Sequence, residues 1–168
     1  RSRFLRLLEA PGRPPRHLIA FDAHPGNFIR HDDGRAVLVD LEKARYGAAA
    51  LDLAHATLYT STTWDRHSQA VLDDAALQQA ATQWLQAMAA SGIAPVPEQV
   101  WIVPLRRAMW LWSITWCATW RAQAGQPRQR LAQGEDWSGE LSDAGLVAHV
   151  RERVDHYLAA PTITFVCE

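Results

Sequence analysis

The hydrophobic pattern of the chain changes near residue 48. Before that point, apolar residues occur in short runs separated by turn-forming residues, which is typical of strands. The pattern predicts a short buried strand at 17–21, a second strand at 27–30 and a returning strand at 36–41. The sequence Asp32-Asp33-Gly34 between the last two strands indicates a hairpin turn.

Beyond residue 48 the apolar positions follow the period of α-helices. The predicted helices cover approximately residues 49–62, 66–90, 97–123 and 143–159, and a further short helix is predicted at 4–8. Segments rich in Gly, Pro and polar residues, at 91–97 and 123–142, separate the later helices. We therefore expect an α+β fold that is mostly helical, with a small β-hairpin region followed by a helical bundle.

Composition and charge narrow the possible functions. The chain has 168 residues, of which 48% are hydrophobic and 21% charged, so it can bury one sizeable core, and we predict a single domain over 1–168. Its net charge of −1 gives no electrostatic attraction for nucleic acid or for an anionic membrane. No apolar run reaches the roughly 18 residues of a membrane span, and the first residues lack the features of a signal peptide. We expect a cytoplasmic protein with no nucleic-acid or membrane partner.

A run of polar side chains interrupts the predicted β region. The sequence FDAHPGNFI, residues 21–29, places an aspartate, a histidine and an asparagine around a Pro-Gly turn. In a hairpin the start of the first strand lies beside the end of the second, so Asp22 and Asn27 can meet Asp40 after the returning strand. Carboxylate and amide oxygens are suitable ligands for Mg²⁺, and a carboxylate that is free of the metal can accept the proton of an attacking hydroxyl.

Three sequence blocks in this region carry a resemblance to a known group of enzymes. The blocks are DAHPGN at 22–27, VDLE at 39–42 and LDLA at 51–54. In order and spacing they resemble the phosphotransfer core of the aminoglycoside phosphotransferase and choline kinase group of kinase-like enzymes. That core has an H-G-D-x-H-x-x-N motif, an apolar strand ending in D-x-E or D-F/W, and a helix beginning with D-L/I-A. The resemblance covers residues 18–55 well and the later helices loosely.

The resemblance implies a fold, an activity and a role for each matching residue. The fold is a protein-kinase-like C-terminal lobe, in which the β-hairpin region carries the catalytic loop. The activity is ATP-dependent phosphorylation of a hydroxyl of a small molecule. By the same resemblance, Asp22 is the catalytic base, Asn27 and Asp40 bind Mg²⁺, and Asp52 holds the catalytic loop through backbone hydrogen bonds.

Four further positions belong to this pattern or depart from it. His24 is expected to pack within the loop, in a structural or supporting role. Glu42 is interpreted either as an acid that supports the site or as a solvated strand end. Ala20 and Phe21 stand where His and Gly are common in the group, so the detailed geometry of the loop is expected to differ while the reacting groups are retained.

The expected ATP-binding half of a kinase-like enzyme has no counterpart in the sequence. Kinase-like enzymes hold ATP beneath an N-terminal lobe whose strand lysine contacts the phosphates. No glycine-rich loop precedes the catalytic block, and the only lysine, Lys43, follows the metal-binding strand, so we do not expect it to be that anchor. We expect the chain to be the C-terminal lobe only, as a fragment or a natural half-protein. Its partner would be the missing N-terminal lobe, and alone it would bind ATP weakly and be inactive.

The acceptor substrate is the least determined feature. The sequence MWLWSITW, residues 109–116, resembles the W-G-L-W-S segment of choline kinases, in which aromatic rings surround a quaternary ammonium. Gap-free matching places Trp112 on one aromatic position but Met109 on the other. The alternative is a helical core, because Trp112, Trp116 and Trp120 recur every four residues. We interpret Trp116 and Trp120 as core residues and leave Trp112 open between core and substrate binding.

Two other functions remain open from the sequence. One is a non-catalytic binding or regulatory module on a kinase-like scaffold. The other is a metal-dependent hydrolase of a different fold that uses the same aspartates. A zinc site built from His24, His31 and Asp32 is also conceivable, although these residues lack a recognised zinc-binding spacing.

Overall fold

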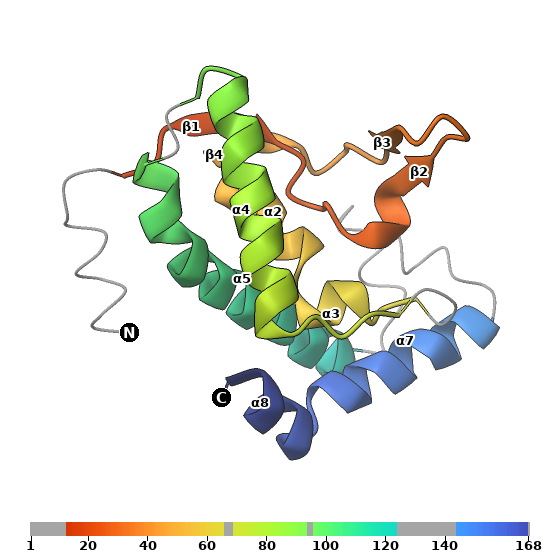
Figure 1. Ribbon diagram of the computed structural model, residues 1–168. Coiled ribbons are helices and arrows are strands. Elements are labelled where there is room, and N and C mark those ends of the chain that lie inside the picture. Colours follow the sequence, from red (N-terminus) through yellow and green to blue (C-terminus); the bar gives the residue numbers. More distant parts are fainter. Residues whose placement is uncertain (1–12, 66–68, 94–95, 124–143, 168) are drawn as a thin grey trace. The chain divides into compact units, whose positions relative to one another are not determined.

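A computed structural model of the protein describes residues 13–65, 69–93, 96–123 and 144–167 (Figure 1). The chain divides into two compact units, Arg1–Trp110 and Leu111–Glu168, and each is described by itself. The described residues form an α+β fold that is mostly helical, as the sequence predicts. The short helix predicted at 4–8 lies outside the described residues.

The first unit contains two small antiparallel sheets. Strands β1 (Arg16–Ile19) and β4 (Arg45–Ala48) form one sheet, in which Ile19 lies opposite Arg45. Strands β2 (Phe28–Arg30) and β3 (Ala36–Leu38) form the other and are joined by the predicted hairpin turn. The sequence pattern does not predict β4, which brings the segment after the hairpin back beside β1.

Two strand predictions need correction. The strand predicted at 17–21 was expected to be buried, but only one of its faces is. Ile19 is buried, whereas Leu18 points to the other face of the two-stranded sheet and is 69% exposed. On the covered face, Ile19 packs so closely over Gly47 that a β-carbon at position 47 would lie 2.7 Å from its side chain. The returning strand predicted at 36–41 ends at Leu38, because Asp40 adopts a left-handed backbone conformation, with φ of 61°.

Helices form the rest of the first unit. They are α2 (Ala50–Ala56), α3 (Tyr59–Thr62), α4 (Asp74–Ala90) and the first part of α5 (Val96–Gln123). The single helix predicted at 49–62 is two helices, since the chain leaves helical geometry at Leu58. The helix predicted at 66–90 begins later, at Asp74, because the Asp73 carboxylate caps it by accepting a hydrogen bond from the amide of Ala76. Helix α2 contacts both α3 and α4.

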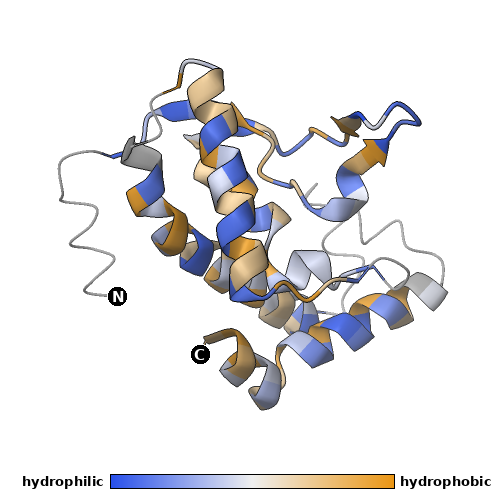
Figure 2. Ribbon diagram, in the orientation of Figure 1, coloured by the Kyte–Doolittle hydropathy of each residue, from blue (hydrophilic) through white to orange (hydrophobic). Residues whose placement is uncertain are grey.

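The second unit contains the rest of α5, together with α7 (Ala144–Tyr157) and α8 (Ala160–Cys167), which contact one another. Val150, Val154 and Tyr157 are fully buried along one face of α7. The predicted helix at 143–159 ends at Tyr157, and α8 was not predicted. Figure 2 shows hydrophilic and hydrophobic residues interspersed along α4 and α7. In the described ranges, no helix has the length and apolar character needed to span a membrane.

The buried face of α5 differs from the predicted tryptophan stripe. Met109, Ser113 and Cys117 are buried, as is Trp120, whereas Trp112 is 41% exposed. A spacing of four residues drifts around a helix with 3.6 residues per turn, so the tryptophans do not share one environment. Trp120 is a core residue as predicted, and Trp116 is half-buried.

Candidate active site

The loop between β1 and β2 is folded by its own hydrogen bonds. The amide of His24 donates to the carbonyl of Asp22 (2.9 Å), and the amide of Asn27 donates to the carbonyl of His24 (3.0 Å). A short 3-10 helix, η1 (Pro25–Asn27), follows, and His24 caps it by accepting a hydrogen bond from the amide of Gly26. The buried side chain of Asn27 donates through Nδ2 to the Asp22 carbonyl (2.9 Å). Asp22 and Asn27 are therefore brought into direct contact.

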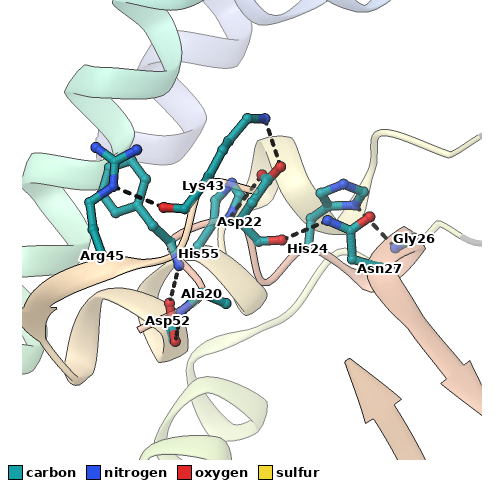
Figure 3. Close-up of polar contacts among 10 residues, drawn as sticks. Ala20, Asp22, His24, Gly26, Asn27, Lys43, Arg45, Asp52 and His55 are labelled. Atoms are coloured by element: carbon teal, nitrogen blue, oxygen red, sulfur yellow. Dashed lines mark hydrogen bonds and ion pairs between the residues drawn. The ribbon is translucent and has the colours of Figure 1, made fainter. Parts of the chain in front are cut away.

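The start of this loop is attached to helix α2 through Asp52. The two carboxylate oxygens of Asp52 accept hydrogen bonds from the amides of Ala20 (2.9 Å) and Phe21 (2.8 Å), as Figure 3 shows. These two amides directly precede Asp22. Because Asp52 lies in the first turn of α2, a regular helix fixes the backbone that carries the Asp22 side chain.

The Asp22 carboxylate is buried and lies between two basic side chains. Its residue is 8% exposed. Oδ2 accepts a hydrogen bond from Nζ of Lys43 at 2.7 Å, and Oδ1 lies 3.7 Å from Nδ1 of His55 (Figure 3). Lys43 comes from the turn before β4 and His55 from α2, so side chains of two different elements lie against this carboxylate, and Lys43 is the one that is hydrogen-bonded to it.

The two histidines beside Asp22 are held in the neutral form. Burial lowers the pKa of His55 to about 4, although the negative charge of Asp22 acts in the opposite direction. Burial also lowers the pKa of His24, against the charges of Asp22 and Asp40. The two imidazole rings meet edge to face, with 6.2 Å between their centroids. At neutral pH, His55 therefore presents an uncharged ring to Asp22.

Asp40 lies at the open end of the β2–β3 hairpin. The amide of Val39 donates to the carbonyl of Asn27 (2.8 Å), so the hairpin pairing extends to Asn27, and Asp40 follows directly. Asp40 is exposed, and its carboxylate makes no hydrogen bond or ion pair within the described part of the chain. Its charge nevertheless acts on the pKa of His24. The structure thus brings Asp40 to the loop that holds Asp22 and Asn27.

Backbone strain is concentrated at this site. Among the described residues, Phe21 and Asp40 are the non-glycine residues with positive φ, at 62° and 61°. Asp tolerates the left-handed region better than most residues, whereas an aromatic residue is rarely found there. Gly is common at the position of Phe21 in the enzymes that the sequence resembles, and Gly adopts a positive φ without steric cost. Strain of this kind clusters at functional sites.

The other predicted site residues have more peripheral environments. Glu42 is exposed in the turn after the hairpin, and Trp112 lies on α5 in the second unit. No group of three or more His, Cys, Asp or Glu side chains in the described ranges could hold a metal ion, so the conceivable zinc site at His24, His31 and Asp32 is not formed. This finding does not apply to a metal site made of Asn27 and Asp40, because Asn27 would contribute an amide oxygen and is not one of those four residue types.

Sequence reasoning missed three residues of the site: Lys43, Arg45 and His55. Lys43 was considered only as an ATP anchor and rejected. Arg45 lies over the ring of Phe21, with its guanidinium carbon 4.0 Å from the ring centroid. The signal that could have found Lys43 and Arg45 is the strand β4, whose pairing with β1 places both residues beside the loop that carries Asp22.

Comparison with known proteins gives the family. In searches of curated proteins and of solved structures, no significant match was found. A family model described as the phosphotransferase enzyme family matches residues 1–84. This range is half of the chain and contains the loop with Asp22 and Asn27, the hairpin end at Asp40 and the supporting Asp52. The chain belongs to the phosphotransferase enzyme family.

Proposed function

We propose that this protein transfers the γ-phosphoryl group of ATP to a hydroxyl of a small molecule, with Asp22 as the general base. The observation that carries the proposal is the environment of Asp22, whose carboxylate is buried and contacted on both oxygens by Lys43 and His55. A fixed carboxylate at a strained loop, in a phosphotransferase family member, is suited to orienting a hydroxyl and accepting its proton.

We propose that Asn27 and Asp40 bind Mg²⁺. The Asn27 amide donates through Nδ2 to the Asp22 carbonyl, which leaves its oxygen available for a cation. The Asp40 carboxylate also has no hydrogen-bonding partner in the described ranges, and both residues lie at the same end of the hairpin. Two oxygen ligands with room for water and phosphate suit Mg²⁺. When bound, the metal would neutralise charge on the phosphates of ATP.

The chain's own residues would prepare Asp22 for the reaction. Asp52 fixes the backbone before Asp22, and the Asn27 side chain fixes the carbonyl of Asp22 itself. The Lys43 ammonium holds the carboxylate through a hydrogen bond to Oδ2, and the neutral ring of His55 lies beside Oδ1. Because positioning contributes much of the rate in phosphoryl transfer, these contacts support catalysis even before a substrate is bound.

We further propose that residues 1–168 act as a kinase-like C-terminal lobe together with a separate N-terminal ATP-binding lobe. The one lysine of the sequence, Lys43, is hydrogen-bonded to the Asp22 carboxylate. The lysine that contacts the ATP phosphates in kinase-like enzymes would therefore come from the separate N-terminal lobe. The acceptor would be an aminoglycoside, a choline-like amino alcohol or a sugar. Trp112, which is 41% exposed, is our candidate for contact with a cationic acceptor.

The test is phosphate transfer from γ-labelled ATP to a panel of aminoglycosides, amino alcohols and sugars, with and without Mg²⁺. The assay uses the 168-residue chain and the product of its complete reading frame. Asp22→Asn is compared with Asp32→Asn, a matched change of an exposed aspartate in the hairpin turn. We expect Mg²⁺-dependent transfer by the complete product and none by the 168-residue chain alone. In the complete product Asp22→Asn should remove the transfer and Asp32→Asn should leave it unchanged. Nucleotide binding without transfer to any acceptor would instead favour a non-catalytic module, and phosphoester hydrolysis without ATP would favour a hydrolase.

A further inference from the structure

Phe21 occupies a backbone position that disfavours a side chain. Its φ of 62° lies in the left-handed region, where glycine is the usual residue. The strain is maintained by the hydrogen bond from its amide to Asp52 (2.8 Å). A glycine here would remove the strain and keep that hydrogen bond, so the phenylalanine must be explained by what its ring contacts.

The ring of Phe21 supports the guanidinium of Arg45. The guanidinium carbon lies 4.0 Å from the ring centroid, within the range of a cation–π contact. Arg45 is an exposed residue on β4, and its position follows from the pairing of Arg45 with Ile19 in the β1–β4 sheet. The ring thus adds a restraint to a long, exposed side chain.

Arg45 in turn contacts the backbone of Lys43. Its Nε donates a hydrogen bond to the Lys43 carbonyl at 3.0 Å (Figure 3). The ammonium of Lys43 then reaches Oδ2 of Asp22 at 2.7 Å. One third of the Lys43 side chain is exposed, whereas only 11% of the Asp22 side chain is exposed. The flexible partner in the ion pair is therefore Lys43, and its backbone is the point at which its position can be controlled.

We propose that Phe21 and Arg45 are positioning residues for Asp22, which act by fixing the backbone of Lys43 so that its ammonium stays on the Asp22 carboxylate. The contacts run in one continuous series from residue 21 to residue 22. The Phe21 ring contacts the Arg45 guanidinium, Arg45 bonds the Lys43 carbonyl, and the Lys43 ammonium bonds the Asp22 carboxylate. The catalytic meaning of this arrangement rests on the proposed function, but the arrangement itself can be tested without it.

The test uses Lys43 as its own probe, because it is the single lysine of the sequence. The chain is treated with limiting acetic anhydride, without nucleotide or acceptor, and mass spectrometry follows acetylation of the Lys43 peptide. We expect Phe21→Leu and Arg45→Met each to accelerate acetylation about two- to fivefold, the population change that a partly exposed cation–π contact supports. Phe21→Tyr, which keeps the ring, should retain the slow rate. Arg30→Met is the matched control, since Arg30 is also an exposed strand arginine but its side chain makes no hydrogen bond or ion pair in the described ranges.

The double variant Phe21→Leu/Arg45→Met should be acetylated no faster than the faster single variant, because both changes interrupt the same set of contacts. Circular dichroism establishes that each variant is folded. Acetylation at the wild-type rate in folded Phe21→Leu and Arg45→Met variants would overturn the proposal, as would two effects that multiply in the double variant. Neither outcome depends on phosphotransfer, so this proposal and the proposed function can fail separately.

A kinetic readout tests the catalytic part of the proposal once an acceptor is identified. We expect Phe21→Leu to lower kcat with little change in KM for ATP, and Phe21→Tyr to restore it. An unchanged kcat in Phe21→Leu, together with faster acetylation of Lys43, would show that the contacts hold the ion pair but contribute nothing to turnover.

Discussion

The ammonium of Lys43 and the carboxylate of Asp22 form an ion pair of 2.7 Å between residues 21 positions apart in the sequence. Asp22 lies in the loop after β1, and Lys43 lies in the turn before β4. Because β1 and β4 are paired, the two residues meet directly beyond the end of the β1–β4 sheet. A buried carboxylate needs a partner, and here the partner is the one lysine of the chain.

Removing that partner should destabilise the fold. We expect Lys43→Met to lower the free energy of unfolding by about 1–2 kcal/mol, because the Asp22 carboxylate stays buried without its cation and Lys43 is partly exposed already. Urea denaturation measures the change. In an Asp22→Asn background the same substitution should cost clearly less. Equal losses in both backgrounds would show that the ion pair contributes no coupling energy.

Asp52 should matter for stability through the loop it holds. The Asp52 carboxylate accepts hydrogen bonds from the amides of Ala20 and Phe21. In Asp52→Asn one of these amides would face an NH₂ group, so we expect the free energy of unfolding to fall by about 1–3 kcal/mol. Thermal denaturation monitored by circular dichroism measures it. Asp74→Asn is the matched control, because Asp74 also lies in the first turn of a helix but its charge acts on the helix dipole, worth about 0.3–1 kcal/mol, and on Arg106. Equal effects of the two changes would mean that the loop contacts are not important.

The sequence predicted the parts of the site that local chemistry determines. The turn at Asp32-Asp33-Gly34 defined a hairpin, and the hairpin places Asn27 near Asp40, as the Val39–Asn27 hydrogen bond shows. Motif resemblance directed attention to Asp22 and Asp52. These inferences needed only neighbouring strands and short-range spacing.

The rest of the site depends on pairings between distant segments. Strand β4 has the sequence RYGA, which carries too little apolar alternation to be predicted, and without it the position of Lys43 cannot be derived. The role of His55 could not be predicted, although the resemblance extends to this residue, because packing decides which face of α2 meets Asp22. The break between α2 and α3 at Leu58 was missed because the apolar period continues across it.

The depressed pKa of His55 predicts how stability depends on pH. Folded His55 has a pKa of about 4, below the ordinary value of 6.5, so between these values the unfolded chain binds a proton that the folded chain does not. Stability should therefore fall as the pH is lowered from about 6.5 to about 4, at up to about 1.4 kcal/mol per pH unit. In His55→Asn this part of the dependence should disappear.

Urea denaturation at several pH values between 4 and 7 measures this effect. His31→Asn is the matched control, because His31 is also a histidine and is exposed in the hairpin turn. If His55→Asn and the wild type lose stability in parallel over this range, His55 is not the group responsible.

The last prediction separates the two aspartates of the proposed mechanism. Asp22→Asn removes the proton acceptor and retains the size of the side chain, so with an accepted alcohol we expect kcat to fall about 10²–10⁴-fold, the usual contribution of a general base. Nucleotide affinity should be nearly unchanged.

Asp40→Asn removes the charge that would bind the metal, so Mg²⁺-dependent nucleotide binding should weaken together with turnover. Because Asp40 is exposed and its carboxylate makes no hydrogen bond or ion pair in the described ranges, and Asn tolerates its positive φ, stability should change by no more than about 0.5 kcal/mol. Calorimetry with Mg·ATP, alongside steady-state kinetics of the complete enzyme, distinguishes the two defects. An Asp22→Asn enzyme with wild-type turnover would remove Asp22 from the role of base, and an Asp40→Asn enzyme with normal Mg²⁺ dependence would remove Asp40 from the metal site.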